Sequence, residues 1–200
     1  MYQSINIALK SVTGAIMKRV FLVTALAVFA PAAASADEVL ETLDAARTAY
    51  EAGKMQQVLD ELAYAQQLVR EMKTAGLTDL LPPAPDGWSR LINTDLSAAM
   101  AMFGGGVGAE ATYSRGQDSF TILLMADNAM VQGFAGMLGA AGLLVGKQLR
   151  IGSETFIEQE GELTGLVDNR ILVQANGAPL DVMQPILEQI DFDAMAGFGR

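Results

Sequence analysis

The sequence predicts a protein of the α+β class, in which an N-terminal antiparallel helical hairpin precedes a mainly antiparallel sheet with helices packed on one face. Three observations support this prediction. Apolar residues recur at helical spacing between residues 37 and 79, three prolines then interrupt the pattern within residues 82–85, and short alternating runs separated by turns follow. Helices followed by a series of strands are typical of the α+β class.

The expected hairpin covers residues 37–79 and consists of two amphipathic helices. Asp37 is a suitable cap for the first helix, and Gly53 can take the left-handed conformation at its end. A turn this short folds the second helix, which should end near Gly76, back against the first. The apolar positions are Val39, Leu40, Leu43, Ala46 and Tyr50 in the first helix, and Met55, Val58, Leu59, Leu62, Ala65, Val69 and Met72 in the second.

Residues 80–87 form a Pro-rich linker, because prolines so close together favour an extended, stiff chain. Residues 88–200 follow as the α+β domain. Pro185 fits a helix only near the first turn, so the last helix is expected to begin later than Leu180. The predicted strands are 87–93, 109–115, 119–126, 148–151, 155–159, 163–167 and 171–174, and the predicted helices are 95–103, 129–146 and 180–190.

Residues 1–36 have the features of an N-terminal extension with a cleavable signal peptide. A basic pair follows Met17, residues 20–30 are an uncharged apolar run, and Ala34-Ser35-Ala36 is an A-x-A cleavage site. The run is shorter than the about 20 residues that cross a bilayer, and a permanent N-terminal anchor is the alternative. We expect cleavage after Ala36, a periplasmic mature protein, and translation from Met17 rather than Met1.

The mature chain is expected to be strongly acidic. Cleavage after Ala36 removes three bases and no acid, which leaves ten bases against 23 acids and a net charge of −13. Nucleic acid is therefore not expected as a partner, since phosphate binding needs clustered Lys and Arg. The expected partner is another protein or a small apolar ligand.

The composition excludes several kinds of chemistry. The chain has no cysteine and no histidine, so disulfides, thiolate metal sites and the commonest general base are missing. The Gly-rich residues 104–108 lack the Lys and Ser/Thr of a phosphate loop. Two acidic clusters, Glu158/Glu160/Glu162 and Asp191/Asp193, do not have the spacing of a calcium loop. We therefore expect no catalytic residues, no cofactor and no metal, and keep a histidine-free hydrolase as an alternative.

Two surfaces are candidates for binding a ligand or partner: the helical hairpin of residues 37–79 and the uncharged segment 129–146. A helix here has bulky residues on one face and small residues on the other, so it can pack on a sheet and still offer an adaptable face. The alternative is a membrane-associated accessory protein that inserts these 18 residues, which contain a GxxxG pair. The candidate residues are Met130, Phe134, Met137, Leu138, Gly142 and Gly146.

Residues 81–197 resemble exported proteobacterial proteins of unknown function. The resemblance lies in the Pro-rich segment 81–88 that ends at Trp88, the strand 169–173 and the closing Ile190-Asp191-Phe192. The order of these features is also similar to the PsbP-like sandwich, whose members are non-catalytic accessory subunits. This resemblance implies a periplasmic, non-enzymatic accessory or binding role, and it transfers no site residues.

Overall fold

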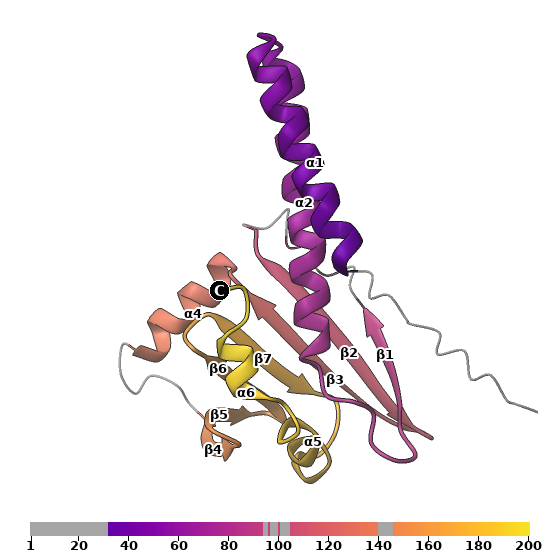
Figure 1. Cartoon of the computed structure of the whole chain (residues 1–200). Coiled ribbons are helices and arrows are strands. Elements are labelled where there is room, and N and C mark those ends of the chain that lie inside the picture. Colours follow the sequence, from indigo (N-terminus) through magenta and orange to yellow (C-terminus); the bar gives the residue numbers. More distant parts are fainter. Residues whose placement is uncertain (1–31, 94–95, 97–99, 101–104, 140–145) are drawn as a thin grey trace, which may run out of the picture. The chain divides into compact units, whose positions relative to one another are not determined.

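The computed structural model describes residues 32–93, 96, 100, 105–139 and 146–200. The predicted α+β class is confirmed: two long helices precede one seven-stranded antiparallel sheet, with the strand order β1-β2-β3-β7-β6-β5-β4 (Figure 1). The predicted helix 95–103 falls almost entirely outside the described residues. The strands are β1 (Ser89–Asn93), β2 (Val107–Arg115), β3 (Asp118–Ala126), β4 (Lys147–Ile151), β5 (Glu154–Gln159), β6 (Glu162–Val167) and β7 (Ile171–Asn176).

The helical hairpin consists of α1 (Ala32–Glu51) and α2 (Met55–Asp79). The turn between them contains Gly53 with a φ of 74°, as expected for a glycine that ends a helix. Two expectations about helix ends were wrong. Helix α1 begins before Asp37, so Asp37 lies inside the helix and does not cap it. Helix α2 continues past Gly76 because the first prolines, which cannot extend a helix, come only after Asp79.

The sheet is built from two meanders, β1-β2-β3 and β4-β5-β6-β7, in which each strand pairs with the next. Strands β3 and β7 join the meanders in the middle of the sheet, with a register that runs from Thr121↔Asn176 to Ala126↔Ile171. The predicted turn at Asp168 and Asn169 is confirmed, since both residues have positive φ angles of 50° and 53°.

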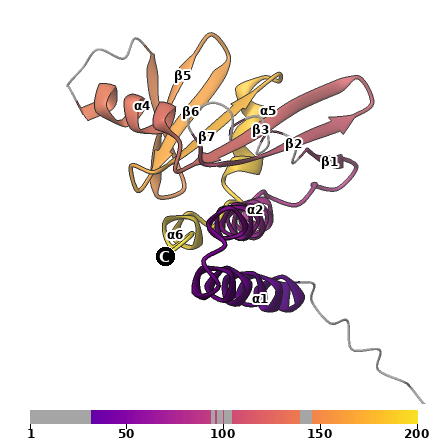
Figure 2. The same cartoon turned by 90° about the horizontal axis from the view of Figure 1, so that it is seen from above.

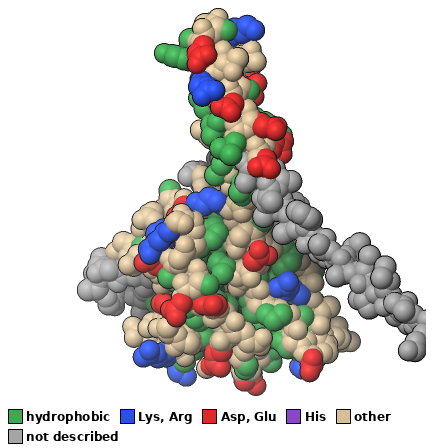
Figure 3. Space-filling model, viewed as in Figure 1, with side chains coloured by type: hydrophobic (Ala, Val, Ile, Leu, Met, Phe, Trp, Pro, Cys, Tyr) green, Lys and Arg blue, Asp and Glu red, His purple; other side chains and the backbone are tan. Residues whose placement is uncertain are grey.

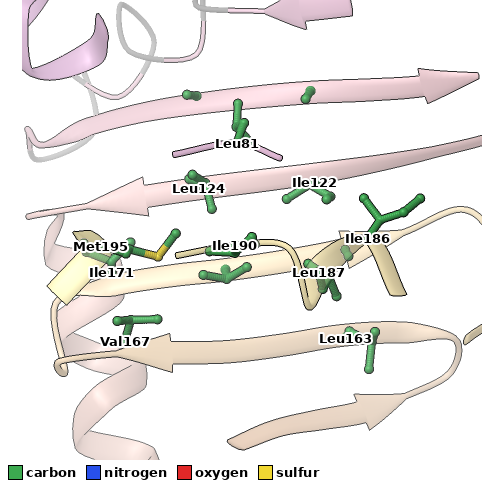
Figure 4. Packing of buried hydrophobic residues seen from close by; sticks show 14 of the residues in the cluster. Leu81, Ile122, Leu124, Leu163, Val167, Ile171, Ile186, Leu187, Ile190 and Met195 are labelled. Carbon is green, nitrogen blue, oxygen red and sulfur yellow. The ribbon is translucent and has the colours of Figure 1, made fainter. Parts of the chain in front are cut away.

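The main core lies on one face of the sheet. Alternate residues of the strands, such as Ile122 and Leu124 on β3, point into it and are fully buried. Helix α5 (Leu180–Leu187), helix α6 (Phe192–Ala196) and the end of α2 cover this face. Figure 4 shows Leu187 of α5 and Met195 of α6 beside the side chains of the strands. The segment 80–87 has no helix or strand, yet its Leu81 is buried in the same core, which therefore includes the end of the hairpin.

Helix α4 (Ala129–Gly139) covers the other face, whereas the sequence suggested that all helices pack on one face. Figure 2 shows α4 on the opposite side of the sheet from α2 and α6. The reason is that β3 and β7 have apolar residues on both faces: Met125 and Leu172 point away from the main core and pack against Val131 of α4.

The C-terminal helices differ from expectation in two ways. Helix α5 begins at Leu180, so Pro185 lies in its second turn and removes one backbone hydrogen bond. An interior proline costs about 3 kcal/mol, but α5 buries Met183, Ile186 and Leu187, each contributing about 1.5–3 kcal/mol. Helix α6 was not predicted. Its signal is Asp191, whose side chain accepts a hydrogen bond from the backbone N–H of Ala194 at 2.9 Å.

Candidate functional site

The structure places the predicted surface residues of segment 129–146 in different environments. Met130 is 65% exposed, whereas Phe134 is half-buried against the cluster beneath α4. A Cβ on Gly146 would lie 2.8 Å from the carbonyl oxygen of Glu158, so this glycine lets the chain pass close to β5. Met137 and Leu138 lie at the end of α4, where side chains are outside the described part, and Gly142 is also outside it.

The start of α4 is fixed by Asn128, a residue that was not among those predicted to be functional. Its side chain is buried and accepts a hydrogen bond from the N–H of Met130 at 2.8 Å, as a helix cap does. The same side chain donates to the carbonyl oxygen of Gly105 at 2.5 Å. Asn128 therefore connects the start of α4 to Gly105, which lies just before β2.

A pocket of about 370 Å³ lies beside Phe134 on this face of the sheet. Its wall includes Glu162, whose carboxylate accepts hydrogen bonds from Thr164 at 3.1 Å and from Gln174 at 3.0 Å. An apolar ligand here would meet carboxylates and amides, and their desolvation opposes its binding. The lining residues are Phe134, Ile157, Gln159, Glu160, Glu162, Thr164 and Gln174.

Two further findings concern membranes and metals. Within the described ranges, no helix is both long enough and apolar enough to cross a bilayer. In the same part of the chain, no three acidic side chains converge as a metal site would require. Glu158 of the first predicted acidic cluster accepts a hydrogen bond from the N–H of Gly161 at 3.2 Å, and Asp191 of the second caps α6.

An ion-pair cluster around Asp127 connects parts of the chain that are distant in sequence. Lys73 of α2 donates to one carboxylate oxygen of Asp127 at 2.6 Å, and Arg170 donates to the other at 3.0 and 3.2 Å. Arg170 also donates to the carbonyl oxygen of Phe198 at 3.2 Å. Partial burial alone would raise the pKa of Asp127, but the hydrogen bonds from Lys73 and Arg170 outweigh it and lower the pKa.

Replacing Asp127 with asparagine should lower the free energy of unfolding by about 1–2 kcal/mol at neutral pH, because two cations lose their anionic partner. Asparagine tolerates the positive φ of 55° at this position, so the backbone need not change. Since the folded pKa is lowered, the stabilisation is present above the unfolded pKa and is lost as pH falls below about 4.

Urea unfolding at several pH values tests this expectation. The difference between the wild type and Asp127→Asn should be largest at neutral pH and should shrink as the carboxylate of Asp127 is protonated. Asp118→Asn is the matched control, because Asp118 forms an exposed ion pair with Arg115. A difference that stays constant to about pH 2 would contradict the role given to the charge.

The helical hairpin has a different kind of surface. Small side chains fill the contact between α1 and α2: Thr42, Ala46 and Ala49 of α1 are buried, as is Ala65 of α2. Figure 1 shows the two helices side by side. Leu68 of α2 is also buried, but most of the larger apolar residues of the two helices remain exposed.

These larger residues form two rows, which we call the apolar seam. Each row has the alternating spacing of three and four residues that keeps positions on one face of a helix. Seven of the nine positions are apolar or aromatic and exposed, with Leu40, Tyr50 and Leu59 more than 60% exposed. The seam consists of Leu40, Leu43, Arg47 and Tyr50 on α1, and Met55, Leu59, Leu62, Gln66 and Val69 on α2.

Both rows of the apolar seam lie on the same side of the hairpin. At about 100° per residue, each row is rotated by roughly 100–120° from the inner face of its own helix, in the same sense. When two helices run antiparallel and face each other, turning by the same angle from the contact, in the direction of increasing residue number, leads to the same side of the pair in both helices. The two rows therefore lie side by side. Tyr50 then lies beside Met55 at the turn, and Leu43 lies beside Leu62.

The other sides of the hairpin are mainly polar, with Tyr64 and Met72 as further exposed large side chains. On the side opposite the apolar seam, the hydroxyl of Tyr64 donates to the carboxylate of Glu38 at 2.5 Å, which connects the two helices and raises the pKa of the Tyr64 hydroxyl. An acidic row follows the outer edge of α1 and consists of Asp37, Glu41, Asp44 and Glu51, all exposed. In Figure 3, hydrophobic side chains run along the hairpin, with acidic side chains gathered on one side of them.

The α2 row of the seam continues toward the sheet, and there the chain itself covers it. The next positions at the same spacing are Lys73 and Gly76. A Cβ on Gly76 would lie 3.5 Å from the ring of Phe198, and the amine of Lys73 lies 5.8 Å from the centre of that ring. At this end the row is no longer apolar and is covered by Phe198, whereas the positions from Met55 to Val69 are exposed.

No family model matches this chain, and no curated protein or solved structure is significantly similar to it. The site must therefore be assigned from the residues themselves. Of the two surfaces suggested by the sequence, the one on α4 adjoins a polar pocket, whereas the hairpin exposes large apolar side chains in an ordered array. The apolar seam is the better candidate.

Proposed function

We propose that this chain is an exported, periplasmic, non-enzymatic accessory protein that acts through protein contacts made by the apolar seam. The observation that supports the proposal is the exposure of seven large side chains on one side of the hairpin. Soluble proteins rarely expose contiguous apolar patches beyond a few hundred Å² unless the patch binds something. The signal-like residues 1–36 support export.

The surface chemistry favours a protein over the two other occupants that the sequence suggested. The pocket beside Phe134 is lined mostly by polar and acidic side chains, which do not suit an apolar ligand. A chain with 23 acids against 13 bases is repelled by anionic lipid headgroups. An exposed array at helical spacing instead suits the side chains of another protein.

The proposal can be tested by placing a photo-crosslinking amino acid at Leu62 in the full chain, in cells that naturally produce it. Leu62 is in the seam, and Glu71 on the same helix is the control because it is exposed on the polar side of the hairpin. We expect one protein to be captured from Leu62 and, separately, from Leu43, but not from Glu71.

The second arm of the experiment removes the apolar contact. Leu43→Glu, with the crosslinker at Leu62, should abolish capture, because a carboxylate would have to be buried against the partner. Circular dichroism should show unchanged helix content, since Leu43 points away from the contact between α1 and α2. Equal capture from Leu62 and Glu71, or capture that survives Leu43→Glu, would contradict the proposed role.

A further inference from the structure

We infer that the apolar seam binds a single amphipathic helix of a partner protein, with large apolar residues at heptad spacing and Lys or Arg along one flank. This inference rests on the proposed function and specifies the chemistry of the partner. Three features support it: the spacing of the seam, its length and the one-sided charge beside it.

The spacing of the seam fits a helix. Both rows follow the alternation of three and four residues by which the residues of one helix fit between those of a neighbour at a crossing angle near 20°. A third helix over the line between α1 and α2 would touch both rows at once. It would bury Leu43 and Leu62 at its centre and Tyr50 and Met55 at the end near the turn.

The length of the seam sets the length of the partner helix. The α2 row runs from Met55 to Val69, which is about 21 Å at a rise of about 1.5 Å per residue. A partner helix of about 14–18 residues would span it. Beyond Val69 the row is covered by Phe198, so the partner's contact ends there.

The charge beside the seam specifies the flank of the partner helix. The edge of α1 has the four acids of the acidic row, of which Asp44 is paired with Arg47 of the seam at 3.4 Å, so the edge stays acidic. The corresponding edge of α2 is close to neutral and consists of Gln56, Asp60, Ala63, Gln67 and Arg70. A basic flank on the α1 side would be attracted, and the asymmetry would favour one orientation of the partner helix.

A second copy of this chain is a poorer occupant. The hairpin from residue 37 to residue 79 has nine acids against four bases. Two such hairpins placed seam to seam would bring like charges together, which opposes association. The apolar rows alone would permit a dimer, so the charge is the observation that decides between the two occupants.

The inference is tested with two synthetic 18-residue helical peptides that share leucines at their heptad positions and differ only in one flank, which is lysine in the first and glutamate in the second. Binding of each labelled peptide to the exported protein is followed by fluorescence anisotropy. We expect the lysine peptide to bind and the glutamate peptide to bind at least about tenfold more weakly, because several ion pairs are replaced by repulsions.

Three variants show whether binding uses the seam. Leu62→Glu should abolish binding of the lysine peptide, although it makes the protein more acidic and would strengthen a purely electrostatic association. Neutralising the acidic row with Asp37→Asn, Glu41→Gln, Asp44→Asn and Glu51→Gln should make the affinities of the two peptides similar. Glu71→Gln is the control, because Glu71 lies on the polar side of the hairpin and should have no effect.

Other outcomes would overturn the inference. Equal binding of both peptides, or no binding of either, would exclude a basic-flanked helix as the partner, whereas the proposed function would stand if Leu62 still captured a protein. Self-association seen by analytical ultracentrifugation and lost in Leu62→Glu would assign the seam to a second copy. If the lysine peptide bound more tightly than the glutamate peptide but no protein were captured from Leu62 in cells, the result would count against the proposed function.

Discussion

Replacing Phe156 with alanine should lower the free energy of unfolding by about 3–5 kcal/mol, the usual cost of removing a fully buried phenylalanine. Phe156 lies on β5 with no exposed surface, and its ring is 6.1 Å from that of Phe192 on α6. On the neighbouring strand it lies against Gly165, where a Cβ would be 2.7 Å from the ring. Alanine would therefore leave a cavity that Gly165 has no side chain to fill.

Urea denaturation provides the measurement, and Leu91→Ala is the control. Leu91 is 73% exposed on β1, so its replacement should change the free energy of unfolding by less than about 0.5 kcal/mol. For a chain of this size the Phe156 variant should also unfold on the order of 10 °C lower than the wild type. If the free energy of unfolding fell by the same small amount in both variants, Phe156 would not be packed against Gly165 and Phe192 as the structure shows.

Replacing Gly106 with alanine should destabilise the protein by roughly 3 kcal/mol, through strain and a steric clash together. Gly106 has a φ of 88°, a conformation that residues with a side chain rarely adopt. A Cβ here would also lie 2.5 Å from the carbonyl oxygen of Ala126 and 3.0 Å from Asn128. The added methyl group would push β2 away from β3 at the point where their pairing begins.

Gly161→Ala separates the two causes. Gly161 has a similar φ of 82°, but a Cβ there meets no atom within 4 Å. This variant should therefore show only the backbone cost of about 1–2 kcal/mol. Urea titrations give the free energy of unfolding of both variants. If it falls equally in the two, the Cβ at position 106 does not clash with the carbonyl oxygen of Ala126.

The elements of the fold could be predicted because their signals are local. Apolar periodicity and a glycine turn predict α1 and α2, and the turn at Asp168 and Asn169 predicts the hairpin of β6 and β7. The face covered by α4 could not be predicted. It depends on which side of β3 and β7 meets Val131, and those strands are apolar on both sides.

The candidate site was predictable only in part. Helical spacing identified Leu40, Leu43 and Tyr50 as apolar positions, but it placed them on one face with Val39 and Ala46. The structure separates them, because Ala46 packs against α2 and the larger residues remain outside. Periodicity shows which residues share a face, and it does not show whether a second face is covered.

The cluster around Asp127 had no local signal. Its partner Lys73 is 54 residues away in the chain, and Arg170 is 43 residues away. Only the pairing of β3 with β7 and the packing of α2 on the sheet bring these charges together. Such a cluster is a product of the tertiary fold and not of any motif.

The junction of β3 with β7 has a consequence for how the chain acquires its fold. The partners in this junction are 45 to 55 residues apart, whereas the other strand pairs join neighbours in the sequence. During synthesis the first meander is therefore completed while one edge of β3 still lacks its neighbour. An open apolar edge is a template for other chains, so the interval before β7 arrives is the period in which newly made copies are most prone to aggregate.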